Sequence, residues 1–88
     1  MSTDRGLLTF PCEFMIKVVG MKSDSFEIEV LSTIRRYVSE LKEDCISTRL
    51  SKDGHYLSLS ITITATSQKQ LDSLYNELTA NPRVIIAL

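Results

Sequence analysis

The side chains most often used in catalysis are few and lie apart in this sequence. Cys12 and Cys45 form no Cys-x-x-Cys pair, and neither has a histidine at metal-ligand spacing, so both are expected to be reduced thiols. His55 follows Asp53 in a turn, and no serine or cysteine nucleophile is placed by the local sequence to use it. The carboxylates are scattered, without the pairing of an acid–base or metal site. The sequence therefore predicts no catalytic centre, no metal site and no cofactor.

Composition and charge narrow the class of protein further. The 88 residues are 43% hydrophobic and 24% charged, which is typical of one small globular domain. Ten Lys plus Arg against eleven Asp plus Glu give a formal net charge of −1, so no net field favours a nucleic-acid backbone. No apolar run approaches the roughly 20 residues of a membrane span, and no signal-peptide pattern is present. We expect a cytoplasmic protein without a membrane partner.

The first half of the chain predicts a strand and then a helix. Residues 12–20 alternate with a period of two, rich in β-branched and aromatic residues, and Gly20 ends the run. Serine and aspartate at 23–25 offer helix caps, and an amphipathic helix of about 17 residues is expected to follow. Its apolar positions recur at spacings of three and four: Phe26, Val30, Ile34, Tyr37, Val38 and Leu41.

The second half predicts a hairpin, a second helix and a final strand. Residues 45–51 alternate, the Asp53-Gly54 step supplies the turn, and residues 56–65 carry the strongest period-two pattern in the chain. Ser67 and Gln70 match the S-x-x-Q capping box, which begins a helix that ends near Asn81-Pro82. The apolar run 84–88 is too short for a helix and is read as a strand.

The order of elements indicates an α+β, ferredoxin-like β-α-β-β-α-β fold. Right-handed crossovers give a four-stranded antiparallel sheet in the order 4-1-3-2, with two helices on one face. We expect residues 1–9 to be a flexible tail and residues 10–88 to be a single domain.

This topology predicts which groups lie at each end of the sheet. The start of the first strand, the hairpin at Gly54 and Leu88 are expected at one end. Gly20, both helix N-termini and Pro82 are expected at the other end. Cys12 and Cys45 would then lie at opposite ends of the sheet, beyond the roughly 7 Å between Cα atoms that a disulfide tolerates.

Several functions known on this fold require particular residues, which can be compared with those in the sequence. A metal chaperone needs a cysteine pair in the first loop, and an acylphosphatase-like site needs an arginine there, but this loop offers only Lys22 as a charged side chain before its acidic cap region. An RNA-recognition sheet carries aromatic rings on its third strand. Here Ser58, Ser60 and Thr62 hold the outward positions, and only Tyr56 remains as a platform.

Two features of the predicted fold are candidates for binding. The helix N-termini expected beside Gly20 and Lys22 offer amides to a small anion, although the serine caps satisfy those amides on the plainer interpretation. The uncovered sheet face around Lys17 combines apolar side chains with a serine and threonine ladder. It is either a solvated face or a docking surface.

Short segments taken in order resemble the YbeD-like family of small bacterial proteins. They are Phe10-Pro11-Cys12-Glu13-Phe14-Met15-Ile16-Lys17-Val18-Val19-Gly20, Gly54-His55-Tyr56-Leu57-Ser58, Leu74-Tyr75-Asn76-Glu77-Leu78 and Val84-Ile85-Ile86-Ala87-Leu88. The resemblance spans about residues 7–88 and implies a ferredoxin-like fold similar to amino-acid-sensing ACT domains. It implies a regulatory role, in some proposals linked to lipoate metabolism, and no established activity. Lys17, Gly20, Gly54 and Tyr56 match the family pattern.

The resulting functional hypothesis is a non-catalytic regulatory or interaction module. It would bind a partner protein or a small metabolite, with Lys17, Gly20, Lys22, Gly54 and Tyr56 as the candidate binding residues. The glycines are expected where a turn needs positive φ, and Tyr56 where a ring is buried with its hydroxyl in water. The alternative is a nucleic-acid-binding accessory domain, which the charge does not favour. A monomer or a weak dimer is expected, because the second strand offers a polar edge.

Overall fold

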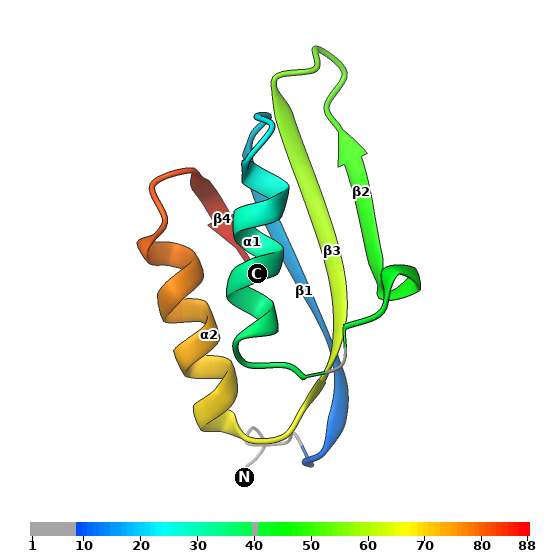
Figure 1. Ribbon diagram of the computed structural model, residues 1–88, viewed down its shortest axis with the longest axis vertical. Coiled ribbons are helices and arrows are strands. Elements are labelled where there is room, and N and C mark those ends of the chain that lie inside the picture. The colour runs from blue at the N-terminus through cyan, green and yellow to red at the C-terminus, as the bar shows by residue number, and fades with distance from the viewer. Residues whose placement is uncertain (1–8, 40) are drawn as a thin grey trace, which may run out of the picture.

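The computed structural model describes residues 9–39 and 41–88 of the chain. Its elements are β1 (Cys12–Met21), α1 (Phe26–Arg35), a short 3₁₀ turn (Glu43–Cys45), β2 (Ile46–Leu50), β3 (Tyr56–Ala65), α2 (Gln68–Ala80) and β4 (Val84–Ala87). The sheet order is β2-β3-β1-β4, which confirms the predicted topology. Both helices lie on one side of the sheet (Figure 1). The predicted tail lies, for residues 1–8, outside the described residues.

The long pair β1 and β3 forms the centre of the sheet. They run antiparallel in an unbroken register from Cys12 opposite Ala65 to Met21 opposite Tyr56. Because side chains alternate across a strand, one set of positions faces the helices and the other faces away from them. Ile16 and Val18 of β1 and Leu59 and Ile61 of β3 are fully buried on the helix side.

The helices close the core through stripes at helical spacing. α1 contributes Phe26, Val30 and Ile34, and α2 contributes Leu71, Leu74 and Leu78, all of which are buried. The Ser23 hydroxyl accepts from the amide of Phe26, the first residue of α1, at 3.1 Å, whereas Ser25 at the N-cap position makes no side-chain cap. At α2 the predicted cap is present, since the Ser67 hydroxyl accepts from the amide of Gln70 at 3.0 Å.

The predicted length of the first helix is wrong. α1 ends at Arg35, well short of Leu41, and its last turn tightens because the amide of Tyr37 donates to the carbonyl of Ile34 at 3.0 Å. The carbonyl of Tyr37 then accepts from the Gln70 side chain at 2.8 Å instead of continuing the helix. Val38 still packs into the core from this non-helical segment, so the apolar spacing continues past the helix end.

The predicted assignment of groups to the two ends of the sheet is also wrong in part. β3 runs antiparallel to β1, so its last residue, Ala65, lies opposite Cys12, and α2 begins at the end where β1 begins. The Gly54 hairpin lies instead beside the end of β1, where the amide of Lys22 donates to the carbonyl of His55 at 2.9 Å. Leu88 lies at neither end, because its backbone exchanges two hydrogen bonds of 2.8 Å with Lys17 in the middle of β1.

The cysteines also lie differently from their predicted positions. Ile46, next to Cys45, pairs with Ile61, which pairs with Ile16, so Cys45 and Cys12 lie toward the same end of the sheet. They remain two strands apart, which is roughly 10 Å across the sheet, and both are free thiols. The structure therefore also holds the two cysteines apart, but by their separation across the strands and not by the predicted separation along the sheet.

Candidate functional site

Four of the five candidate binding residues meet at one end of the sheet. We call this the hairpin end and define it by Gly20 to Lys22 on β1 and the following loop, and by Ser51 to Tyr56 in the hairpin. Met21 pairs with Tyr56, and Lys22 is bonded to His55, so the end of β1 and the hairpin are held together. Lys17, the fifth candidate, lies exposed in the middle of β1.

Glycine is required at the two candidate positions for different physical reasons. Gly54 has φ of 77°, as the hairpin turn requires, and an added Cβ would meet nothing within 4 Å. Gly20 does not have positive φ, and the expectation of a turn there is wrong, because it lies buried within β1. A Cβ on Gly20 would stand 2.3 Å from the Phe26 ring and 2.4 Å from the Arg83 carbonyl oxygen. Gly20 therefore allows close packing of β1 against α1 and β4.

The sheet surface opposite the helices, here named the open face, carries an unusual share of large apolar side chains. Met15, Met21, Tyr56, Ile86 and Leu88 are exposed, and pairing places them on one side: Met21 with Tyr56, Val19 with Ile86, and Lys17 with Leu88. Between them, β3 contributes only short side chains, those of Ser58, Ser60, Thr62 and Thr64. The open face is therefore apolar along β1 and β4 and polar along β3.

The open face also carries positive charge. Lys17 on β1 and Arg49 on β2 both pair with serines of β3, so both side chains project from this side. Glu13, near the start of β1, is the acidic residue at an open-face position of the described strands. In a chain with a formal charge of −1, this face is therefore more cationic than the molecule as a whole.

A shallow hollow of about 450 Å³ lies where the open face meets the hairpin end. Its lining comes from β1, β2, β3 and the hairpin turn: Val19, Arg49, Leu50, Ser51, Lys52, Tyr56 and Ser58. Tyr56 is the candidate residue that reaches it. The charged groups of this lining, Arg49 and Lys52, were not predicted from the sequence, where they look like ordinary solvated residues of a hairpin.

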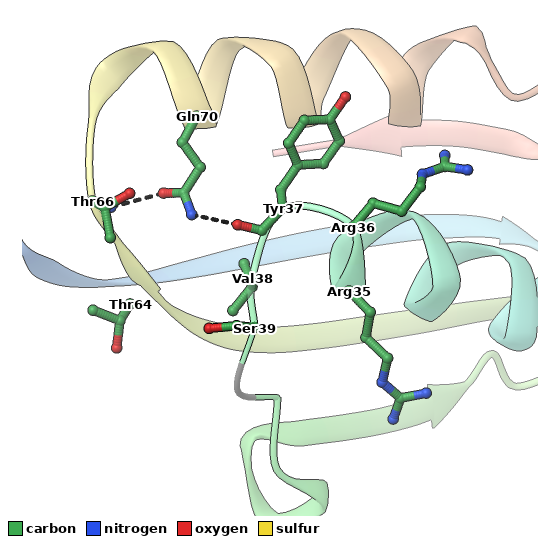
Figure 2. Close-up of a pocket in the computed structure, with 8 residues that line it drawn as sticks. All are labelled: Arg35, Arg36, Tyr37, Val38, Ser39, Thr64, Thr66 and Gln70. Atoms are coloured by element: carbon green, nitrogen blue, oxygen red, sulfur yellow. Dashed lines mark hydrogen bonds between the residues drawn. The ribbon is translucent and has the colours of Figure 1, made fainter.

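A larger hollow of about 560 Å³ lies at the other end of the molecule, between the end of α1 and the start of α2. Gln70 bridges the two elements there, accepting from the amide of Thr66 at 2.7 Å and donating to the carbonyl of Tyr37 (Figure 2). The side chains of Arg35 and Arg36 extend away from this bridge (Figure 2). The hollow is thus organised around a structural hydrogen bond, and its cations do not converge on it.

Tyr37, Arg36 and Glu77 form a cluster that joins the helices. The Tyr37 hydroxyl and the Arg36 guanidinium both donate to the carboxylate of Glu77. The hydrogen bond to Glu77 raises the pKa of the Tyr37 phenol above its ordinary value of 10.0, with further upward shifts from burial and from the charge of Glu77, while Arg36 acts in the opposite direction.

The hydrogen bond between Tyr37 and Glu77 is expected to make the stability of the fold depend on pH in alkaline solution. The folded state holds the Tyr37 proton more tightly than the unfolded chain, so its stabilising contribution is complete below pH 10.0 and is lost as pH rises through the folded-state pKa. We expect Glu77→Gln to lower the Tyr37 pKa toward its ordinary value, measured by NMR titration of the phenol carbon. Glu27→Gln, which removes the same charge near the other end of α1, is the control. An unchanged Tyr37 pKa in Glu77→Gln would contradict the assignment.

Within residues 9–39 and 41–88 there is no group of three or more His, Cys, Asp or Glu side chains that could hold a metal ion. Over that same part of the chain, no helix combines the length and the apolar character needed to cross a membrane.

The fold is that of a ferredoxin-like domain, and it is similar to the fold of ACT domains. The solution structure of protein HP0495 from H. pylori has a TM-score of 0.77 at 13% identity, covering 96% of this chain and 88% of that one. The ACT domain from the GTP pyrophosphokinase of Chlorobium tepidum has a TM-score of 0.64 at 18% identity, covering 86% and 84%. At these identities the likeness shows the fold alone.

The sequence comparison gives the family. The chain belongs to the family described as "Protein of unknown function (DUF493)", whose model matches residues 5–88, and this confirms the YbeD-like resemblance. A UPF0250 protein of Nitrosomonas europaea is 41% identical over 86 residues, covering 98% of this chain and 99% of that protein. A UPF0250 protein of Paraburkholderia phytofirmans is 36% identical over 87 residues, covering 99% and 98%.

Proposed function

We propose that this protein is a non-catalytic, cytoplasmic regulatory module that binds a partner protein through its open face. The observation that carries the proposal is the set of exposed apolar side chains there, Met15, Met21, Tyr56, Ile86 and Leu88. Contiguous apolar surface of this kind is uncommon on monomeric proteins outside interaction sites, and Met, Tyr and Arg are enriched in interfaces.

The charge of the open face indicates the chemistry of the partner. Lys17 and Arg49 stand among or beside the apolar residues, and neither forms an ion pair with another described residue. A partner with an apolar patch bordered by Asp or Glu would complement both properties at once. The family and the ACT-like fold agree with a regulatory module and do not specify its partner.

The alternative from the sequence, a nucleic-acid-binding domain, is less well supported. Bases are usually held on a sheet by aromatic rings, whereas β3 presents Ser58, Ser60 and Thr62 on the open face. Tyr56 is the aromatic residue at an open-face position of the described strands. Salt-sensitive binding to single-stranded RNA is the observation that would favour this alternative.

The test uses two variants and a matched control. Proteins retained by the immobilised chain from a bacterial extract are identified, purified and bound again by calorimetry. Met15→Ser and Lys17→Glu are each expected to weaken the complex about tenfold or more, as for residues central to an interface. Ile28→Ser, on the outer side of α1, is the control, because Ile28 and Met15 are similarly exposed at 68% and 62%.

The outcomes separate the alternatives. Weakened binding in both open-face variants, with full binding by Ile28→Ser, supports the proposed surface. Equal binding by all variants, or loss only with Ile28→Ser, contradicts it. Retention of RNA in place of protein, reduced by Lys17→Glu and by salt, would transfer the assignment to the nucleic-acid alternative.

A further inference from the structure

The hollow at the hairpin end exists because one short side chain lies between larger ones. Val19 of β1, Ser58 of β3 and Arg49 of β2 form a row across the open face, since Ser58 pairs with both of the others. In the next row toward the turn, Tyr56 is bonded through its carbonyl to the amide of Ser51 at 2.9 Å. A serine surrounded by valine, arginine and tyrosine leaves a depression whose floor is the sheet itself.

The charged groups of the hollow have one sign. Arg49 and Lys52 line it, and no carboxylate belongs to its lining. Neither cation forms an ion pair within the described part of the chain. Two cations that share a concave surface without a counter-ion repel each other, and an anion placed between them removes this repulsion.

Asp53 is the nearest acidic residue in sequence, and it is held by the hairpin. Its carboxylate accepts from the Ser51 hydroxyl at 2.7 Å and from the His55 amide at 3.1 Å. These hydrogen bonds lower the pKa of Asp53, first through Ser51 and then through the His55 amide. The carboxylate therefore acts as a fixed part of the turn, and Arg49 and Lys52 remain available to a ligand.

The remaining surface of the hollow is suited to the body of an organic molecule. Val19, Leu50 and the ring of Tyr56 supply apolar area, and Ser58 supplies a hydroxyl. The volume of about 450 Å³ falls within the roughly 300–1,000 Å³ of small-molecule sites. Apolar walls with a few convergent polar groups are the usual composition of such sites.

We propose that this hollow is a binding site for a small organic anion, with a phosphate or carboxylate between Arg49 and Lys52 and an apolar or planar body against Tyr56. Arginine and lysine both hold phosphate and carboxylate, arginine with two parallel hydrogen bonds. The site overlaps the surface proposed for a partner protein at Tyr56 and Arg49, but the proposal does not depend on that partner. Ligand binding at this site can be measured on the isolated protein, without the partner.

The experiment is an NMR amide-shift titration at low ionic strength with four matched probes. Phenyl phosphate and benzoate carry both an anionic group and a ring, inorganic phosphate carries the charge alone, and phenol carries the ring alone. We expect the two ring-bearing anions to shift the amides of Ser51, Tyr56 and Ser58 at lower concentration than either single-feature probe. The stronger of the two identifies the anionic group as phosphate or carboxylate.

Variants test the two features separately. Arg49→Gln removes a charge and is expected to weaken binding of the stronger probe about tenfold, which is the usual effect of a lost charge-assisted hydrogen bond. Ser58→Phe fills the hollow without changing charge and is expected to abolish the shifts. Thr62→Phe adds the same ring on the same face of β3, outside the hollow, and is expected to bind like the wild type.

The proposal is overturned if none of the probes shifts these amides, or if the shifts are equal in Arg49→Gln and the wild type. Shifts caused equally by inorganic phosphate and phenyl phosphate would also overturn it, since they indicate a surface ion effect without a site. If Ser58→Phe does not fold, Arg49→Gln alone decides between these results.

Discussion

Gly20→Ala is expected to destabilise the fold by about 3 kcal/mol or more, because one of the two clashes it creates is with backbone. The added Cβ would lie 2.3 Å from Cε1 of Phe26 and 2.4 Å from the carbonyl oxygen of Arg83, both far inside van der Waals contact. Overpacking of a core costs about 1–3 kcal/mol or more, and a chain of this length has a total stability of roughly 4–13 kcal/mol. The midpoint of urea denaturation measures the loss.

The backbone contact makes this clash difficult to relieve. A smaller side chain at position 26 would remove the contact with the Phe26 ring, but the Arg83 oxygen belongs to the chain that enters β4, where Gly20 pairs with Val84. We therefore expect Gly20→Ala combined with Phe26→Leu to recover only part of the stability. Gly54→Ala is the control, with nothing near its Cβ and only the cost of φ 77°, which is about 1–2 kcal/mol. Equal midpoints for the two single alanine variants would contradict the packing argument.

Gly20 also shows where sequence patterns stop being informative. Its position at the end of an alternating run predicts a turn, yet the strand continues to Met21 and the glycine is buried inside it. The need for glycine comes from Phe26 and Arg83, which are 6 and 63 residues away along the chain. A contact between distant segments leaves no local signal in the sequence. The sequence therefore indicates that Gly20 matters but does not indicate its role in packing.

The strands and their sides were predictable because alternation is a local property. In β3, Leu59, Ile61 and Ile63 are buried while the serines and threonines between them face outward, as the period of two requires. Element order then gave the correct strand order. The predicted end for the hairpin is wrong because β3 runs antiparallel to β1, so β3 begins beside the end of β1 and returns the chain to the start of β1.

The length of α1 was missed for a different reason. The apolar positions of the predicted helix continue to Val38 and beyond, and Val38 is indeed buried. Burial at helical spacing, however, does not require helical backbone. The helix ends at Arg35, and beyond its end the Tyr37 carbonyl accepts from the side chain of Gln70, from α2, in place of a helical amide.

The candidate site was predictable in part. Tyr56 and Lys17 are recognisable from the sequence, as an aromatic residue beside a turn and as a charge within an apolar strand. Arg49 is not recognisable, because its significance depends on the row it forms with Ser58 and Val19 across three strands. The serine ladder of β3 reads as a solvated surface until neighbouring strands supply the large side chains around it.

Phe26→Ala is expected to destabilise the fold at least as much as Gly20→Ala. Phe26 is fully buried at the first turn of α1 and stands first by volume among the fully buried side chains. Removal of a buried phenylalanine costs about 3–5 kcal/mol, because the transfer free energy of the ring is lost and a cavity remains. In a domain of this size that is a large part of the stability of about 4–13 kcal/mol.

The same helix supplies the comparison that isolates this effect. Ile28 lies two residues further along α1 and is largely exposed, so Ile28→Ala should change stability by no more than about 0.5 kcal/mol. Both variants replace an apolar residue with a strong helix former, so helix propensity does not explain a difference between them. A large difference in denaturation midpoint therefore measures packing of the ring against β1 and the rest of the core. If the two midpoints agree, Phe26 is not the anchor that its burial indicates, and the docking of α1 on the sheet must depend on Val30 and Ile34.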